Sequence, residues 1–180
     1  MAFRELGVED YPRFLQIYNE SFPEDERRLY RVAGHVEEVV REKGGKFRGF
    51  VYDDGGDFFL GVMTYWIFEG YVYVEHFAVD PNQRGKSIGS KMLGHLFETV
   101  SPNVLIEVEM PGLPETDRRI AFYERNGFRK REEIKYIQPP YSPGQKGMQL
   151  LIMTHGEVEI KDMGDMEEML REVYNVNKGI

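Results

Sequence analysis

The 180-residue sequence contains no cysteine. Without a thiol the chain can form neither a disulfide nor a covalent intermediate on cysteine, and this composition fits a reducing compartment. No apolar run approaches the roughly 18 residues that a membrane-spanning helix requires. The N-terminal residues also lack the basic stretch and apolar run of a signal peptide. We therefore expect a cytoplasmic protein with no membrane partner.

The sequence also has few basic residues relative to acidic ones. It contains 23 lysines and arginines and 31 aspartates and glutamates, which gives a net charge of −8. Nucleic acids are held largely through their phosphates by basic side chains, so this balance argues against a nucleic-acid partner. It favours a cationic small molecule or a basic peptide. His35, His95 and His155 lie on scattered segments without metal-ligand spacing, so no metal site is predicted.

The length suits one α/β domain. Apolar periodicity and turn residues predict helices over about 8–21, 25–43, 87–100 and 116–126, and strands over about 2–6, 46–53, 57–68, 71–79, 103–110, 128–138 and 148–154. Hairpin signals make the segments between 46 and 79 an antiparallel meander. The crossover through helix 87–100 predicts that strand 103–110 runs parallel to strand 71–79.

The tail, residues 156–180, is expected to be a helical addition to a domain of residues 1–155. Between 161 and 176 its methionines fall on one helical stripe. Such a stripe packs into a core or forms a partner-binding face, for example in a homodimer.

A short basic turn between strand 71–79 and helix 87–100 is the most informative segment. Free N–H groups and the helix dipole make a helix N-terminus attractive to anions. Arg84 and Lys86 add full charges, and Gly85 and Gly89 let the backbone come close to a ligand. The turn therefore predicts a phosphate-binding site, the alternative being a plain turn before a core helix.

Two other phosphate motifs fit this turn poorly. A Walker A loop would need glycine where Asp80 stands, and Pro81 follows it. A dinucleotide fingerprint fails because Ser87 and Ser90 occupy two of its three glycine positions.

The turn resembles the pyrophosphate loop of the GNAT N-acetyltransferase superfamily, with Arg84, Ser87 and Gly89 at the positions of its motif. Ser87 departs from the usual first glycine and would be strained if the position needs a positive φ. The segment 120–128, IAFYERNGF, resembles the family's downstream helix, which ends in Tyr, three residues and Gly-Phe. The resemblance covers about residues 2–153. It implies a mixed, mostly antiparallel central sheet of about seven strands with helices on both faces, plus the C-terminal helix.

The resemblance further implies acetyl-CoA as co-substrate and transfer of its acetyl group to a primary amine by direct attack in a ternary complex. The pyrophosphate would lie against the loop residues Arg84, Gly85, Lys86, Ser87, Ile88, Gly89 and Ser90. The pantetheine arm would pair with the backbone of Phe77, Ala78 and Val79, and an N–H near there would polarise the thioester carbonyl.

Two side chains match catalytic positions of the family. Tyr123 matches the tyrosine that protonates the departing thiolate, although it could instead simply pack with Ile120. Glu75 stands where members with an identified general base carry Glu or His. It would accept the proton of the amine, or only bind the ammonium or pair with an arginine.

The acceptor site is expected beside these residues. Strand alternation places Tyr73, Glu75 and Phe77 on one face, with His76 on the other as a structural histidine. Tyr73 would join Glu75 in that site.

Further acceptor-binding candidates lie later in the chain. Glu107 and Glu109 share one strand face and would recognise a cationic acceptor, or else pair with Arg118 or Arg119. Other walls of the pocket would be Tyr136, Tyr141 and the corner at residues 22–24.

The sequence leaves rival functions open. A catalytically weak CoA-binding sensor or interaction module is one, because Ser87 replaces a glycine and Thr116 stands where asparagine is common. An acyltransferase that uses a longer acyl-CoA donor is another. Among acceptors, a polyamine, an aminoglycoside, an amino acid and a protein amine all fit.

Overall fold

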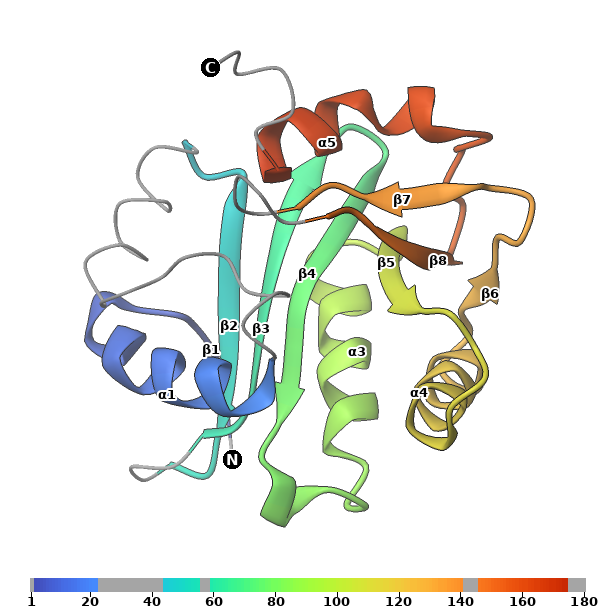
Figure 1. Ribbon diagram of the computed structural model, residues 1–180. Coiled ribbons are helices and arrows are strands. Elements are labelled where there is room, and N and C mark those ends of the chain that lie inside the picture. Colours follow the sequence, from blue (N-terminus) through green and yellow to red (C-terminus); the bar gives the residue numbers. More distant parts are fainter. Residues whose placement is uncertain (1, 23–43, 56–58, 141–145, 175–180) are drawn as a thin grey trace.

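A computed structural model describes residues 2–22, 44–55, 59–140 and 146–174 of the chain. Its strands form one eight-stranded sheet in the order β1-β2-β3-β4-β5-β8-β6, with β7 also paired to β8 (Figure 1). The strands are β1 (Ala2–Glu5), β2 (Phe47–Asp53), β3 (Phe59–Phe68), β4 (Tyr71–Val79), β5 (Val104–Glu109), β6 (Arg129–Lys130), β7 (Tyr136–Gln138) and β8 (Met148–His155).

Helices flank this sheet. They are α1 (Tyr11–Ser21), α3 (Ile88–Thr99), α4 (Pro114–Arg125) and α5 (Glu167–Tyr174), with the short 3-10 segments η1 (Val8–Asp10), η3 (Pro81–Gln83) and η4 (Met163–Met166). The predicted helix 25–43 lies outside the described residues. Within the described ranges, no helix combines the length and apolar character needed to cross a bilayer.

The predicted strand pairing is confirmed. Strands β2, β3 and β4 form the antiparallel meander, and β5 lies parallel to β4. The sheet has eight strands because segment 128–138 is not one strand, as predicted, but the two short strands β6 and β7. Between them a turn, closed by a hydrogen bond from Ile134 N–H to the Arg131 carbonyl, buries Ile134 in the core. The mixed, mostly antiparallel sheet of the prediction is therefore what forms.

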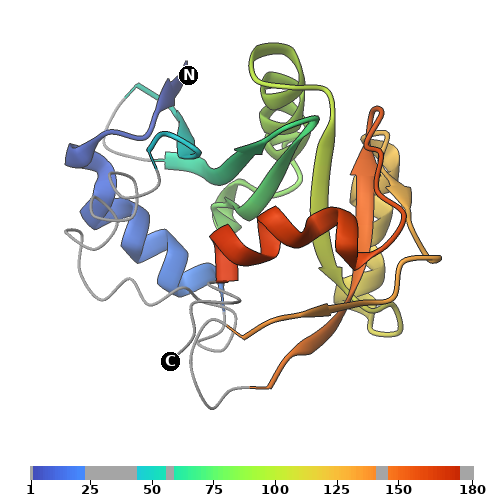
Figure 2. The ribbon, with the colours of Figure 1, turned by 90° about the horizontal axis from the view of Figure 1, so that it is seen from above.

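Helices cover both faces of the sheet (Figure 2). On one, which we call the α1/α5 face, side chains of these two helices pack on the sheet residues Trp66, Tyr73 and Leu105. On the other, the α3/α4 face, a second buried cluster joins α3 and α4 to the sheet. Alternate side chains of each strand therefore point to opposite faces of the sheet, and each side chain packs against the helices on its own face.

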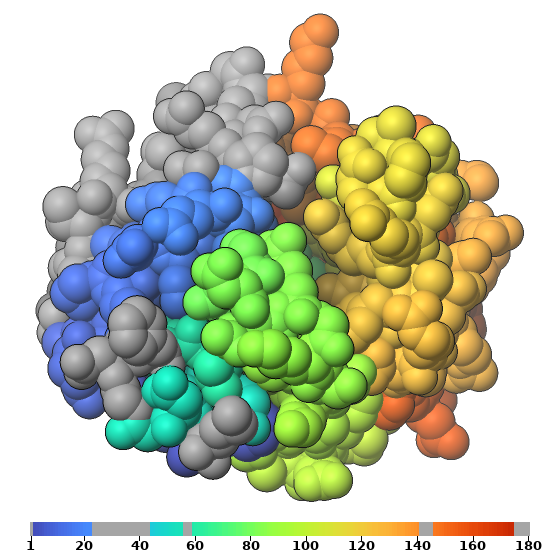
Figure 3. Space-filling view, turned by 90° about the horizontal axis from the view of Figure 1, so that it is seen from below, coloured from blue at the N-terminus to red at the C-terminus, as the bar shows by residue number. Residues whose placement is uncertain are grey.

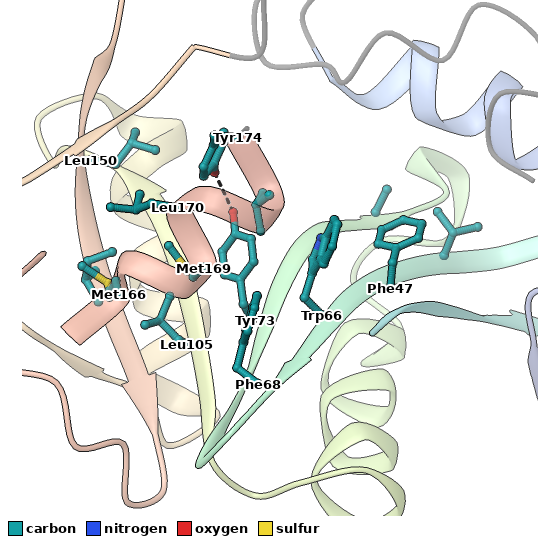
Figure 4. Close-up of a cluster of buried hydrophobic side chains, with 14 of the residues drawn as sticks. Phe47, Trp66, Phe68, Tyr73, Leu105, Leu150, Met166, Met169, Leu170 and Tyr174 are labelled. Atoms are coloured by element: carbon teal, nitrogen blue, oxygen red, sulfur yellow. Dashed lines mark hydrogen bonds between the residues drawn. The ribbon is translucent and has the colours of Figure 1, made fainter. Parts of the chain in front are cut away.

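The methionine stripe of the tail is core packing. Met166 and Met169 are fully buried and belong to the same cluster as Leu105 and Leu150 of the sheet (Figure 4). A stripe buried in this way cannot also present a partner-binding face. Helix α5 is thereby held against the strands that carry the candidate site.

Candidate functional site

Strands β4 and β5 part in the middle of the sheet. They are paired at Val72–Val104, Tyr73–Leu105 and Val74–Ile106, and the described strands share no register pair beyond that point. Backbone groups on the facing edges are therefore available to an extended ligand that enters between the strands. We call this opening the splay.

A β-bulge lies at the splay. Val74 is opposite Tyr65 and His76 is opposite Thr64, so β4 has one extra residue, Glu75, between these two register pairs. Such a bulge shifts the alternation of side chains by one position.

The predicted alternation is consequently wrong beyond Glu75. His76 and Ala78 lie on the α1/α5 face together with Tyr73, while Phe77 and Val79 pack on the α3/α4 face. The sequence offered no residue type that marks the bulge. Its effect is to crowd polar side chains onto the α1/α5 face at the splay.

The carboxylate of Glu75 is oriented by Trp66, whose indole Nε1–H donates a hydrogen bond of 2.6 Å to Glu75 Oε2. Trp66 itself is fully buried, whereas Glu75 is only partly buried. The carboxylate is therefore fixed in direction on the face that α1 covers. This tryptophan contact was not predicted.

His76 is a buried residue whose two ring nitrogens both have partners. Its Nε2 lies 3.0 Å from the Tyr18 hydroxyl, and its Nδ1 lies 3.3 Å from Thr64 Oγ1. These contacts fit the structural role expected of this histidine, although its side chain points to the face opposite the predicted one.

The basic turn leads from β4 into α3 and exposes its charges. Arg84, Lys86 and Ser87 are all exposed, while Ile88 is buried as the first residue of α3. Figure 3 shows a hollow between the surface of this turn and α3 and the surface of α4. An anion at the start of α3 would lie at the edge of this hollow.

Gly89, in the first turn of α3, lies against two aromatic rings. A Cβ atom at this position would be 2.9 Å from the ring of Phe122 on α4 and 3.5 Å from the ring of Phe77 on β4. Any larger residue would have to displace Phe122. The close approach of the first turn of α3 thus depends on a glycine.

Ser87 is the one non-glycine residue of the described chain with a positive φ, at 58°. It is the N-cap of α3, and its side chain makes no capping hydrogen bond there. The left-handed conformation costs about 1–2 kcal/mol for a residue with a Cβ atom. The strain that the sequence suggested for this position is therefore present.

Replacing Ser87 with glycine should stabilise the fold. Relief of the strain outweighs the entropy that glycine adds to the unfolded chain, so we expect a free energy of unfolding higher by about 0.5–1 kcal/mol. Ser87→Ala, which keeps the Cβ atom, is the matched control and should change it by less than about 0.5 kcal/mol. Denaturant unfolding measures both, and equal stability of the two variants would contradict the strain.

Tyr123 is buried between Phe122 and Phe128, whose ring centroids both lie 5.3 Å from its own. Only 9% of the residue is exposed, and among the described residues its hydroxyl has no hydrogen-bond partner. Burial raises the pKa of this phenol to about 12, so it keeps its proton at neutral pH. A buried hydroxyl without a protein partner is unusual in a native structure and is explained if a ligand completes it.

Glu109 and Glu107, which the sequence paired, have different surroundings. Arg119 on α4 forms an ion pair with Glu109, so the salt-bridge alternative is the one the structure shows for this residue. Glu107 has no such cation among the described residues and accepts hydrogen bonds from neutral groups instead.

Three side chains donate to Glu107. The Tyr136 hydroxyl donates to Oε1, while Gln138 Nε2 at 2.7 Å and the Tyr174 hydroxyl at 2.8 Å donate to Oε2. The hydroxyl of Tyr174 also lies 2.9 Å from that of Tyr73 (Figure 4). Burial raises the pKa of Glu107 to about 7, although these hydrogen bonds oppose the shift.

Some predicted site residues lie outside the described part of the chain, and Thr116 makes contacts within its own helix. Tyr141 and residues 23–24 of the predicted corner lie outside the described residues. The Thr116 hydroxyl is used within α4, where it bonds the backbone of Leu113. Among the residues that the structure describes, no three histidine, aspartate or glutamate side chains are grouped as a metal site requires.

Comparison with known proteins identifies one family. Residues 45–130 match the family model of the acetyltransferase (GNAT) domain. YjbC of Bacillus subtilis, a protein assigned as an acetyltransferase, is 26% identical over 120 residues, which are 66% of this chain and 57% of YjbC. The match thus spans little more than half the length of that relative.

Two solved structures extend the comparison. A Bacteroides thetaiotaomicron protein assigned as an acetyltransferase of the GNAT family superimposes with a TM-score of 0.80 at 32% identity, over 98% of this chain and 100% of its own. The spermidine N-acetyltransferase of Vibrio cholerae in complex with CoA and spermine gives a TM-score of 0.63 at 16% identity, over 85% of this chain and 93% of its own. At that identity the second likeness concerns the fold alone.

Proposed function

Because the chain belongs to the GNAT family of acetyltransferases, we propose that it transfers the acetyl group of acetyl-CoA to a primary amine by direct attack in a ternary complex. The observation that carries the proposal is the splay between β4 and β5. The basic turn before α3 and the hydroxyl of Tyr123, which has no hydrogen-bond partner among the described residues, lie toward the α3/α4 face. Two carboxylates lie on the other face.

The residues present suit acetyl-CoA. In this proposal the pyrophosphate lies on the exposed turn from Arg84 to Ser90, where helix N–H groups and two cationic side chains meet it. Gly89 allows the close approach, and the backbone of Phe77–Val79 pairs with the pantetheine arm. Bound in this way, the co-substrate supplies an acetyl thioester to the amine.

The acceptor would approach from the α1/α5 face, where Glu75 and Glu107 flank the splay and Tyr73 lies beside them. Carboxylates at a partly desolvated site attract cations and repel anions, as does the net charge of −8. The Vibrio cholerae structural neighbour is itself a spermidine N-acetyltransferase. These observations support a cationic amine as acceptor.

Two side chains would move protons. Glu75, held by Trp66, would accept a proton from the amine nitrogen, so that its lone pair can attack the carbonyl carbon. Tyr123 would donate its proton to the departing sulfur, because its buried phenol is neutral and has no partner in the described protein.

The test is binding of the co-substrate followed by turnover. Acetyl-CoA and CoA should raise the melting temperature, since saturation at 100 times Kd stabilises the native state by about 2.7 kcal/mol, whereas ATP and NAD should not. Gly89→Leu should abolish the shift because its side chain collides with Phe122. Gly94→Leu is the matched control, since a Cβ at Gly94 on the same helix meets nothing within 4 Å.

Turnover separates the rival functions. Thiol release from acetyl-CoA should appear with cationic amines and be weakest with glutamate and aspartate as acceptors. Binding of CoA without thiol release across the amine panel would instead identify a sensor or interaction module. Faster release from a longer acyl-CoA would identify a different acyl donor.

A further inference from the structure

Glu75 and Glu107 occupy equivalent places on the two strands of the splay. Val74 and Ile106 are the last register pair of β4 and β5, and each glutamate is the next residue of its strand. Both project to the α1/α5 face, because Glu75 contacts Trp66 and Glu107 contacts Tyr174 of α5. The mouth of the splay therefore has one carboxylate on each side.

The two carboxylates are held differently. Around Glu107 stand Tyr73 from β4, Tyr136 and Gln138 from β7, and Tyr174 from α5, all of them neutral groups. Burial raises the pKa of Tyr136 well above its ordinary value, so this phenol remains a donor. The carboxylate at the equivalent position across the splay is that of Glu75. No cation of the described residues pairs with Glu107.

Tyr174 links the elements around this carboxylate. Its hydroxyl bonds Glu107 of β5, the Tyr73 hydroxyl of β4 and, at 3.1 Å, the Gln138 amide of β7. The phenol thus joins both strands at the base of the splay, and it comes from the C-terminal helix. Although Tyr174 is distant from these strands in the sequence, it gives the C-terminal helix a direct contact with the candidate site.

Proton balance requires more than one acceptor event. An ammonium acceptor R–NH₃⁺ loses two protons when it becomes the amide R–NH–CO–CH₃. One equivalent of proton ends on the CoA thiol, and the other is released to solvent. A single carboxylate would have to take a proton, discharge it and take another within one turnover.

We propose that Glu107 is a second proton acceptor for the acceptor amine, and that Tyr174 is its positioning residue; this rests on the proposed acetyltransfer. Glu107 takes a proton from R–NH₃⁺, which leaves R–NH₂ and a neutral carboxyl group. The nitrogen lone pair then forms the C–N bond as the C–S bond breaks. The second nitrogen proton passes to Glu75, and the sulfur takes the proton of Tyr123, which solvent restores. Glu107 and Glu75 then release their two protons to solvent, for a net release of one proton per turnover.

Charge and geometry favour this assignment over simple anchoring of an ammonium. Three donors already occupy the Glu107 oxygens, which leaves about one lone-pair site. One site is enough for proton transfer from a single ammonium N–H, but not for the several contacts of an anchoring site. A carboxyl group with a pKa of about 7 is, in contrast, well matched to taking up and releasing a proton at neutral pH.

The experiment compares pH profiles of kcat/KM for the wild type, Glu107→Gln and Tyr174→Phe with one cationic amine. The wild type should rise with pH to a plateau with a midpoint near pH 7. Glu107→Gln should lose that limb and at least tenfold of the plateau rate. Tyr174→Phe should move the midpoint to higher pH, because it removes a donor that stabilises the charged carboxylate.

Controls separate these effects from damage to the fold. The thermal shift with CoA should be unchanged in both variants. Tyr65→Phe, which removes a buried phenol hydroxyl on the α3/α4 face, should leave the pH profile unchanged. Infrared difference spectra of wild type against Glu107→Gln should show the carboxyl band of Glu107 titrating near pH 7 even without turnover.

Three results would overturn the proposal. A Glu107→Gln enzyme with the wild-type midpoint and a raised acceptor KM alone would make Glu107 an ammonium anchor. An unchanged midpoint in Tyr174→Phe would leave Tyr174 as a packing residue only. A carboxyl band that titrates near pH 4 would show that Glu107 is an ordinary carboxylate. Failure of the proposed function is recognised separately, because the wild type would then release no thiol with any amine.

Discussion

Replacement of Tyr123 with phenylalanine is expected to lower kcat by about 10²-fold, with little change in acetyl-CoA affinity. The hydroxyl would act on the leaving sulfur and contribute little to ground-state binding, so its loss raises the barrier and not Kd. Its pKa of about 12 keeps it protonated across the assay range, so the loss should be the same from pH 6 to pH 9.

Stability distinguishes this role from packing. The ring of Tyr123 contacts Phe122 and Phe128, and phenylalanine preserves those contacts. Because the hydroxyl has no partner among the described residues, its removal should leave the free energy of unfolding unchanged or raise it by about 1 kcal/mol. Steady-state kinetics, a CoA thermal shift and denaturant unfolding provide the three measurements. A destabilised variant with normal kcat would make Tyr123 a core residue only.

The sequence predicted the local features of the site well. The bounds of β4 were predicted as residues 71–79 and are Tyr71–Val79 in the structure. The meander and the parallel pairing of β5 also follow from short turns and one crossover, which are encoded close together in the chain. The Ser87 strain could be foreseen because a single backbone position carries it.

The rest depends on contacts between distant segments. The bulge that brings His76 to the α1/α5 face arises from the pairing of two strands, and no residue type in β4 announces it. The bonds from Tyr174 to Glu107 and Tyr73 join α5 to strands that precede it by more than 60 residues. Glu109 shows the opposite case, because Arg119 lies only ten residues away and was named as a possible partner.

Glu75→Gln is expected to lower kcat by about 10²-fold while the acceptor KM changes only a few-fold. The Gln side-chain oxygen can still accept the hydrogen bond from Trp66 Nε1, so the variant removes basicity and preserves position. If Glu75 only held the ammonium, loss of its charge would raise the acceptor KM and leave kcat near the wild-type value. Glu69→Gln, in the exposed turn between β3 and β4, controls for the same change in net charge.

The double variant Glu75→Gln/Glu107→Gln tests whether the two carboxylates act on one nitrogen. If each takes one of the two protons in succession, the loss in kcat/KM should be smaller than the product of the single losses. Once the transfer of one proton is blocked, slowing the transfer of the other lowers the rate little further. The effects of mutating residues that act as a unit are therefore not additive. Losses that multiply would instead assign the carboxylates to independent tasks, with Glu107 outside the path of the proton. Single-turnover kinetics at saturating acetyl-CoA would measure the chemical step free of product release.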